Sequence, residues 1–368
     1  MSVQISRVQL VSMLIWTVTA TGIITLPASV AQFTVHDGWM AGVSCLLAGA
    51  ITAPLASWFV RVFPGETLSG ALLLTFGPWL GRGLAVWQSI LLWISVSTIL
   101  REASAFLGAA VLPHTAEPIL TGLCMFIVAF YVAHGLEVMA RVTEATTPFA
   151  LVIGPLLFVL ALRHFDGQEF LPILGDGWSP VLRACVVPVL VYGLETLLVL
   201  HMAPYLRKPE TIGRDLLIAS VIVAALMTLG ITLSIAISGP AASHLQYPML
   251  EVVRTIRLGK YLERLDTLYV MGVMATLILK LSVFHFSLCE VWRHVFALPS
   301  RRIVVYAAAL SAWVGSDFLF RNVHDLGIFI IDTAPAYFAA SFLGLPLLAI
   351  AAAYVRRRVS GTLPARLQ

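Results

Sequence analysis

Long apolar stretches separated by short polar segments run along the whole chain. A helix needs about 20 apolar residues to cross the hydrocarbon core of a bilayer. Stretches near that length occur ten times, which predicts an all-α integral membrane protein with ten transmembrane helices. The predicted spans cover residues 10–33, 39–62, 82–111, 116–134, 147–163, 181–203, 214–239, 265–294, 302–320 and 333–355. We therefore treat residues 1–368 as a single transmembrane domain.

The composition agrees with this class of protein. The chain is 59% hydrophobic and 11% charged, whereas a soluble domain carries about 25% charged residues. That shortage excludes an ordinary soluble enzyme, a disordered chain and a nucleic-acid-binding protein, and it makes the lipid bilayer the first partner. The four cysteines lie in or beside apolar stretches with no CxxC spacing, which predicts neither a disulfide framework nor a zinc site.

The basic residues predict the orientation in the membrane. With ten spans, one set of connecting segments and termini holds fourteen Lys and Arg residues, and the other set holds seven. Cytoplasmic segments are enriched in Lys and Arg. We therefore expect a multi-pass protein of the cell membrane with both termini in the cytoplasm.

The first span contains a candidate break. Gly22 can adopt backbone angles closed to other residues, and Pro27 removes a helical hydrogen bond near Ile23. The pair favours unwinding at Thr21-Gly22-Ile23, which would expose backbone N–H groups at the start of a half-helix and suit a carboxylate ligand. The hydroxyls of Thr21 and Thr25 are further candidates for ligand binding. The alternative is a plain kink.

The sixth span carries a similar signal. Gly193 follows Pro188 closely and precedes Glu195 by two residues. A carboxylate within a span is costly and usually faces a cavity or a partner. Glu195 can coordinate a substrate amine, accept a coupling proton, or pair with a buried Arg or Lys. Tyr192, beside Gly193, is a further lining candidate.

Spans 1 and 6 begin two sets of five helices. Interrupted spans at corresponding positions of two halves are the best sequence indication of a transporter binding site. The arrangement predicts a five-plus-five inverted repeat with broken helices 1 and 6, with repeats at about residues 10–163 and 181–355.

Three further charges lie inside spans. Arg101 and Glu102 are neighbours in span 3 and point about 100° apart, so each needs a partner on another helix, for which Glu195 and Lys280 are candidates. These residues form either a charge relay or a structural clasp, and Ser97 lies one turn from Arg101. Lys280 lies in the middle of span 8. An amine there can take the place of a sodium ion, and it can couple the protein to protons by changing its own protonation.

Motifs of enzymes are missing from the sequence. It contains no GxSxG, Walker A, HExxH or dinucleotide-binding pattern, so we predict that the protein is not an enzyme and has no cofactor. His285, Cys289, Glu290 and His294 resemble metal ligands by type, but their spacing does not put three of them on one helical face. We predict no metal site.

The order of several short motifs resembles the endospore germination permease family, the B subunits of nutrient germinant receptors in spore-forming bacteria. The matching segments are Ile5–Leu10, Gly22–Pro27, Asp37–Trp39, Phe63–Leu68 with Gly77 and Leu80–Gly81, Leu112–Thr115, Gly135 and Glu137 with Arg141, and Tyr192–Glu195. One departure follows Thr67-Leu68, where the family pattern has an acidic residue and this chain has Ser69-Gly70-Ala71.

This resemblance implies a fold like that of the leucine-transporter-type amino-acid transporters. It also implies a protein of the spore inner membrane that senses a small nutrient germinant and works with an A subunit and a lipoprotein C subunit. The germinant-pocket positions carried over by matching motifs are Thr21, Gly22, Ile23, Gly193 and Glu195. The expected function is germinant binding, for which an amino acid is the leading candidate, with signalling to partner subunits. The alternative is a proton-coupled amino-acid permease.

Overall fold

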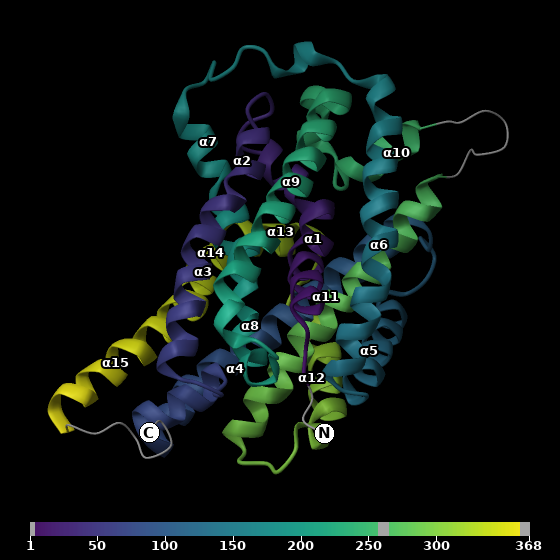
Figure 1. Cartoon of the computed structure of the whole chain (residues 1–368). Coiled ribbons are helices and arrows are strands. Elements are labelled where there is room, and N and C mark those ends of the chain that lie inside the picture. The colour runs from purple at the N-terminus through teal and green to yellow at the C-terminus, as the bar shows by residue number, and fades with distance from the viewer. Residues whose placement is uncertain (1–3, 257–264, 361–368) are drawn as a thin grey trace.

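The computed structural model describes residues 4–256 and 265–360, and they are almost entirely helical. Figure 1 shows the helices running side by side as an elongated bundle. The α-helices of the first half are α1 (Arg7–Ala31), α2 (Trp39–Val43), α3 (Cys45–Val62), α4 (Leu68–Ala110), α5 (Glu117–Ala133) and α6 (Leu136–Ala161). Those of the second half are α7 (Trp178–Ala184), α8 (Val199–Met202), α9 (Ile212–Ser238), α10 (Pro248–Thr255), α11 (Leu265–Val295), α12 (Val305–Phe318), α13 (Val323–Ile328), α14 (Ala334–Phe338) and α15 (Leu345–Ser360).

Eight helical segments of the described chain are long and apolar enough to cross a membrane. The shorter apolar helix α5 has 17 residues, and α12, in the position of the predicted ninth span, has 14. The multi-pass membrane architecture is therefore confirmed, while the count of ten spans stays a prediction.

Two predicted spans begin too late. The helix predicted over 147–163 begins at Leu136, because only His134 and Gly135, the latter at φ 96°, separate it from α5. This φ lies in the left-handed region that glycine adopts at little cost. The last span was predicted over 333–355, but its helical segment begins at Val323. There Asn322 caps α13 by accepting a hydrogen bond from the Asp325 N–H. Polar residues inside these helices shortened both apolar stretches in the sequence.

A single central helix organises the bundle. The 25-residue helix α1 is buried along most of its length, and it packs against α9, α11 and α6. Ser6 and Gln9 close its first turn with a capping box, which satisfies N–H groups that the helix itself leaves open. The start of α1 and the end of α15 lie toward the same end of the molecule, whereas α7 and α10 lie toward the other (Figure 1).

The predicted break in helix 1 is wrong for this structure. Thr21, Gly22 and Ile23 lie inside the continuous α-helix α1, and Pro27 also lies within it. Pro27 removes one hydrogen bond, but the bonds of neighbouring turns and the packing of α9 and α11 hold the helix together. The plain-kink alternative describes this helix better than unwinding does.

Helix 6 is irregular rather than interrupted. After α7, a π-helical turn, η3 (Pro188–Tyr192), leads directly into a 3₁₀ segment, η4 (Gly193–Leu198), and then into α8. The chain stays coiled, but its hydrogen-bond spacing changes twice around Gly193. Such π turns often occur at functional sites, and this one lies beside Tyr192 and Glu195.

The last span has the same kind of irregularity. Two π-helical turns, η9 (Phe329–Thr333) and η10 (Ala339–Gly344), flank α14. Both η9 and α14 contribute side chains to the cavity described below. The remaining short helical turns are η1 (Leu162–His164), η2 (Gly167–Phe170), η5 (Ala203–Tyr205), η6 (Pro209–Thr211), η7 (Gly239–His244) and η8 (Arg301–Ile303).

Candidate ligand-binding site

A buried ion pair joins three helical segments in the middle of the bundle. Lys280 of α11 donates to both carboxylate oxygens of Glu195 in η4, with Nζ–O distances of 2.7 Å. The same Nζ donates to Thr21 Oγ1 of α1 at 2.6 Å. Both charged side chains are almost fully buried, at 1% and 3% exposure. Of the candidate partners for Glu195, the structure thus selects a buried lysine.

Tyr192 encloses this pair from one side. Its hydroxyl lies 2.5 Å from Thr25 Oγ1, and Lys280 Nζ lies 5.4 Å from the centre of its ring. Phe284 of α11 presents a second ring 5.6 Å from the same amine. The ammonium group therefore meets a carboxylate, a hydroxyl and two aromatic faces, each of which attracts a cation.

A small cavity, here called the inner cavity, opens beside the ion pair. Its volume is about 30 Å³, which is room for about two water molecules. In this conformation it does not accommodate an amino acid. The side chains that line it are Thr21, Ser95, Thr98, Ile99, Glu102, Val191, Tyr192, Glu195, Lys280, Phe329, Ile330, Ala334 and Phe338.

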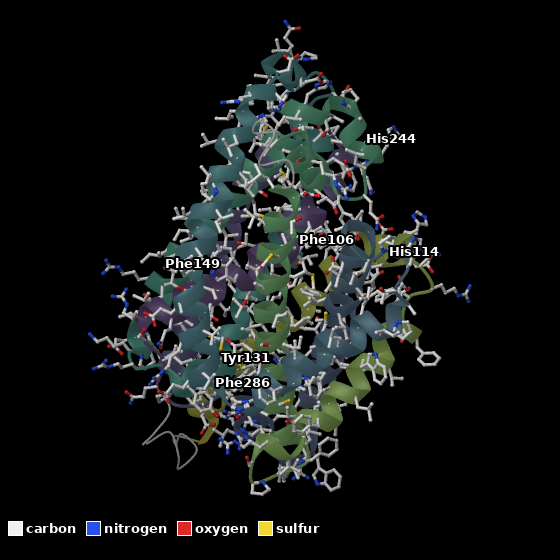
Figure 2. All side chains as sticks on the ribbon, turned by 90° about the vertical axis from the view of Figure 1, so that its right-hand side faces the viewer. Phe106, His114, Tyr131, Phe149, His244 and Phe286 are labelled. Atoms are coloured by element: carbon white, nitrogen blue, oxygen red, sulfur yellow. The ribbon has the colours of Figure 1, made fainter. Side chains whose placement is uncertain are left out.

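A larger hollow, here called the vestibule, lies next to the inner cavity and has a volume of about 610 Å³. Thr25, His244, Tyr247 and Asp332 are among the residues that line it, and Glu102 lines both spaces. In Figure 2, His244 lies toward the upper end of the bundle and Phe106 lies lower, near its middle. Phe106 packs edge-on against Tyr247. Glu102 thus stands where the two spaces approach each other.

The polar atoms of this part of α4 are not all satisfied. Within residues 4–256 and 265–360, Thr98 Oγ1 and Glu102 Oε1 are buried and have no hydrogen-bond partner. The two side chains are 7% and 6% exposed, respectively. A buried polar atom without a partner is costly, so these two atoms indicate a place where a ligand can bind.

Arg101 and Ser97 lie away from this site. Arg101 pairs with Glu117 at 2.6 Å and lies 3.7 Å from Asp317, so neither Glu195 nor Lys280 is its partner. This arrangement matches a structural clasp joining α4, α5 and α12. Ser97 donates to the Ala312 carbonyl oxygen at 3.1 Å and does not line the inner cavity.

The two glycines and Ile23 surround the site without lining the inner cavity. A Cβ atom on Gly22 would meet the end of the Met227 side chain at 2.8 Å, and one on Gly193 would meet Ala48 Cβ at 2.1 Å. Close packing of helices is therefore the evident use of both positions. Ile23 lines a separate apolar groove with α6 and α11 residues.

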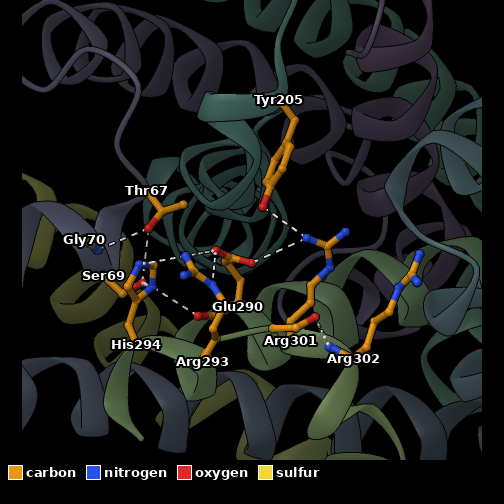
Figure 3. Close-up of polar contacts among 10 residues, drawn as sticks. Thr67, Ser69, Gly70, Tyr205, Glu290, Arg293, His294, Arg301 and Arg302 are labelled. Atoms are coloured by element: carbon orange, nitrogen blue, oxygen red, sulfur yellow. Dashed lines mark hydrogen bonds and ion pairs between the residues drawn. The ribbon is translucent and has the colours of Figure 1, made fainter. Parts of the chain in front are cut away.

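A second buried polar network, here called the α11 polar cluster, lies at the C-terminal end of α11. Figure 3 shows its polar contacts. Glu290 accepts two hydrogen bonds from Arg293, at 3.0 and 2.6 Å, and lies 3.7 Å from Arg301. His294 reaches Ser69 Oγ at 2.8 Å, and Arg301 donates to the Tyr205 hydroxyl at 3.0 Å. The cluster ties the start of α4 to η5 and α11.

The sequence profile of the spore permease family, described as "spore germination protein", matches residues 4–314. This chain belongs to that family. It is 24% identical to the spore germination protein YndE of Bacillus subtilis (strain 168) over 286 residues, which is 74% of this chain and 77% of the relative. It is 25% identical to the spore germination protein XB of Bacillus anthracis over 278 residues, with the same coverage.

Solved transporter structures resemble this germination-family protein in fold. One is MHP1, a nucleobase-cation-symport-1 family transporter in a closed conformation with bromovinylhydantoin bound; the TM-score is 0.73 at 14% identity, over 97% of this chain and 80% of that one. Another is MhsT in complex with L-phenylalanine. Its TM-score is 0.71 at 13% identity, and the match covers 96% of this chain and 98% of that one. The chain thus has the leucine-transporter-type fold of these proteins. The expected family is confirmed, and of the expected fold the all-helical transporter architecture is confirmed, while the count of ten spans and the two repeats stay predictions.

The sequence interpretation missed much of the cavity wall. Ser95, Thr98 and Ile99 lie seven, four and three residues before Glu102, a spacing that puts all of them on its helical face. Ile330, Ala334 and Phe338 repeat every four residues in the last span and also line the inner cavity. A helical projection from Glu102 would have found the first group, because an intramembrane acid usually faces a cavity. The second group carries no polar signal.

Proposed function

We propose that this protein is the B subunit of a spore nutrient germinant receptor and that it binds a small nutrient, most simply an amino acid, at the inner cavity. The observation that carries the proposal is the buried contact of Lys280 with Glu195 and Thr21 beside that cavity. Ionisable groups held together in the middle of a membrane bundle mark functional sites. Membership of the germination family supports the biological role.

The arrangement of the site supports an amino-acid ligand. Its side chains offer a carboxylate, an ammonium and hydroxyls, which together complement both ends of a zwitterion. Thr21, Tyr192 and Glu195 lie on α1 and on the irregular helix 6, the two segments that sequence analysis expected to bind the ligand. The similar MhsT structure is described as a complex with L-phenylalanine.

The small inner cavity fits an occluded state without ligand. Ligand entry then requires α1, α4 or α14 to move apart, and the bound ligand shifts the population toward the state that accommodates it. In the proposed receptor, an A subunit and a lipoprotein C subunit respond to that shift. The protein would lie in the spore inner membrane as two five-helix repeats, with both termini in the cytoplasm and the vestibule on the opposite side.

A proton-coupled amino-acid permease is the second candidate. The Lys280–Glu195 pair favours it, because protonating Glu195 or deprotonating Lys280 would release the contact between α11 and η4. A titratable link between moving helices is what proton coupling needs. Receptor and permease would share the same cavity.

A thermal-shift screen of the purified full-length chain against amino acids, sugars and nucleosides tests ligand binding, because a compound that binds the folded form raises its melting temperature. We expect at least one amino acid to stabilise the wild type and to lose its effect in Glu195→Gln. An effect that Glu195→Gln leaves unchanged would place the ligand elsewhere.

Two assays separate the receptor from the permease. Spores that lack the gene should lose a germination response to the same compound, and the chain should copurify with A and C subunits. Proteoliposomes containing this chain alone should show no proton-driven uptake if it is a receptor. Uptake that persists in Lys280→Ala would exclude the lysine from coupling.

A further inference from the structure

The face of α4 that lines the inner cavity presents two acceptors with no occupant. Thr98 Oγ1 and Glu102 Oε1 lie one helical turn apart, and neither finds a hydrogen-bond partner among residues 4–256 and 265–360. By contrast, the hydroxyls of Ser95 and Ser104 are satisfied by carbonyl oxygens of their own helix, Leu91 and Arg101. Gln88 Oε1 and Arg101 Nε of the same helix also lack a partner among the described residues, but neither side chain lines the inner cavity. Thr98 and Glu102 are the unpartnered positions of α4 that do.

Thr98 and Glu102 share the inner cavity with one further acid, Glu195, and one base, Lys280. Lys280 forms its direct ion pair with Glu195. Glu102 feels the charge of Lys280 only at longer range and has no ion pair of its own in the described part of the chain. The vestibule adds Asp332 to Glu102, and no Lys or Arg occurs among its described lining residues. A carboxylate buried without a direct ion-pair partner is costly, and a cation arriving through the vestibule would lower that cost.

On the basis of the function proposed above, the geometry points to an ammonium-binding seat formed by Glu102 and Thr98, so that the receptor's ligand class is a primary amine that carries a positive charge. An ammonium has three N–H donors and no acceptor. One donates to the Glu102 carboxylate and another to the Thr98 hydroxyl oxygen. The rest of the ligand then extends toward Tyr192 and the Lys280–Glu195 pair.

This assignment separates two roles within the site. Lys280 and Glu195 join helices and respond to the ligand, while Glu102 selects it by charge where the vestibule meets the inner cavity. Molecules without a cationic amine leave Glu102 uncompensated and therefore bind weakly. Selection for the amine would thus depend on α4 rather than on α1 or helix 6.

Three matched sets of compounds test the seat with the full-length chain in lipid nanodiscs. The first set is the free L-amino acids; the second is their amides, which keep the cation and lose the carboxylate; the third is their N-acetyl forms, which lose the cation. For at least one amino acid, we expect the free acid and its amide to raise the melting temperature of the protein. The N-acetyl form of the same amino acid should leave the melting temperature unchanged. Equal stabilisation by the N-acetyl form would overturn the seat.

Variants locate the effect on α4. Loss of a buried hydrogen bond to a charged group should raise the Kd of the free acid and of the amide by about tenfold or more in Glu102→Gln. Thr98→Val should raise both by a smaller factor, and Glu102→Asp should retain the discrimination against N-acetyl compounds. Ser104→Ala and Glu137→Gln remove a satisfied hydroxyl and a surface carboxylate away from both spaces, so they should leave the Kd unchanged.

Folding and the broader function have separate readouts. Without ligand, Glu102→Gln should melt at or above the wild-type temperature, because it removes an uncompensated buried carboxylate. Binding that Glu102→Gln leaves unchanged but Glu195→Gln abolishes would overturn the seat and keep the proposed function. If no amino compound, sugar or nucleoside stabilises the wild type, the seat and the proposed ligand site both fail.

Discussion

Lys280 and Glu195 hold each other in the centre of the bundle, with the amine 2.7 Å from both carboxylate oxygens. The pair joins α11 to η4, and the bond from Lys280 to Thr21 adds α1. Three segments distant in sequence therefore depend on one buried ammonium group. Because the inner cavity lies against it, a change in the cavity can be transmitted to all three.

Removing one partner of this pair should destabilise the protein strongly. We expect Lys280→Met to cost about 3–5 kcal/mol, because it leaves the Glu195 carboxylate buried without compensation. The double variant Lys280→Met/Glu195→Leu should recover most of that loss and still fail to bind ligand. Thermal unfolding of the three proteins in one detergent measures the effect. Equal melting of the single and double variants would mean that the charge imbalance is not the cause.

The glycines of α1 and η4 should respond differently to the same change. A Cβ on Gly193 would lie 2.1 Å from Ala48 Cβ, whereas one on Gly22 would meet only the flexible end of Met227, at 2.8 Å. Gly193→Ala should therefore cost about 1–3 kcal/mol or more through overpacking. Gly22→Ala should be close to neutral, because alanine favours a continuous helix by about 0.5–1 kcal/mol and offsets the shift of Met227.

Melting temperatures of the two glycine variants compare these positions directly. A severe loss in Gly22→Ala with wild-type behaviour in Gly193→Ala would contradict both contacts. It would also favour an unwound helix 1, the arrangement that the sequence suggested and the structure lacks.

The fold was largely predictable because the membrane imposes a strong signal. Apolar length alone located α11 to within one residue at its end, since the predicted span 265–294 became Leu265–Val295. Glu195 and Lys280 were also predictable as candidate site residues, because charges inside spans are rare and usually face a cavity or a partner. Their direct pairing was only one alternative, since the sequence does not give the rotation of η4 against α11.

The errors have local physical causes. Gly22 and Pro27 are typical of a break, but the contacts of α1 with α9 and α11 hold the helix continuous. Arg101 pairs with Glu117, an acid in the first turn of α5. Glu117 lies at the edge of the predicted span 116–134, and the sequence interpretation named only Glu195 and Lys280 as partners. Apolar lining residues such as Phe338 have the same composition as any lipid-facing helix, so only packing reveals them.

The bond between Tyr192 and Thr25 should act as a latch between the two spaces. Tyr192 lines the inner cavity and Thr25 lines the vestibule, and their hydroxyls lie 2.5 Å apart. We expect Tyr192→Phe and Thr25→Val each to cost about 1 kcal/mol, with a coupling energy of about 0.5–1.5 kcal/mol in a double-mutant cycle. The association rate of the ligand should rise in both variants. If the two stability losses simply add in the double variant, the hydroxyls do not form a latch.

Ser69 should hold the start of α4 against α11. A kink at Gly77, where φ is 78°, separates the first turns of α4 from its membrane span, so those turns depend on side-chain contacts. Arg293 donates to His294 Nε2 at 2.9 Å, which leaves the proton of a neutral imidazole on Nδ1, 2.8 Å from Ser69 Oγ. This neutral contact stands where the family pattern has an acid shortly after Thr67-Leu68.

Loss of that contact should loosen the segment without unfolding the bundle. We expect Ser69→Ala to cost about 1 kcal/mol and to raise amide hydrogen exchange in residues 68–76 several-fold, because local opening depends on few contacts there. Ser89→Ala is the matched control, since that exposed hydroxyl bonds only to the Val86 carbonyl oxygen of the same helix. Unchanged exchange in Ser69→Ala would show that packing of Leu68 and Leu72, both fully buried, holds the segment alone.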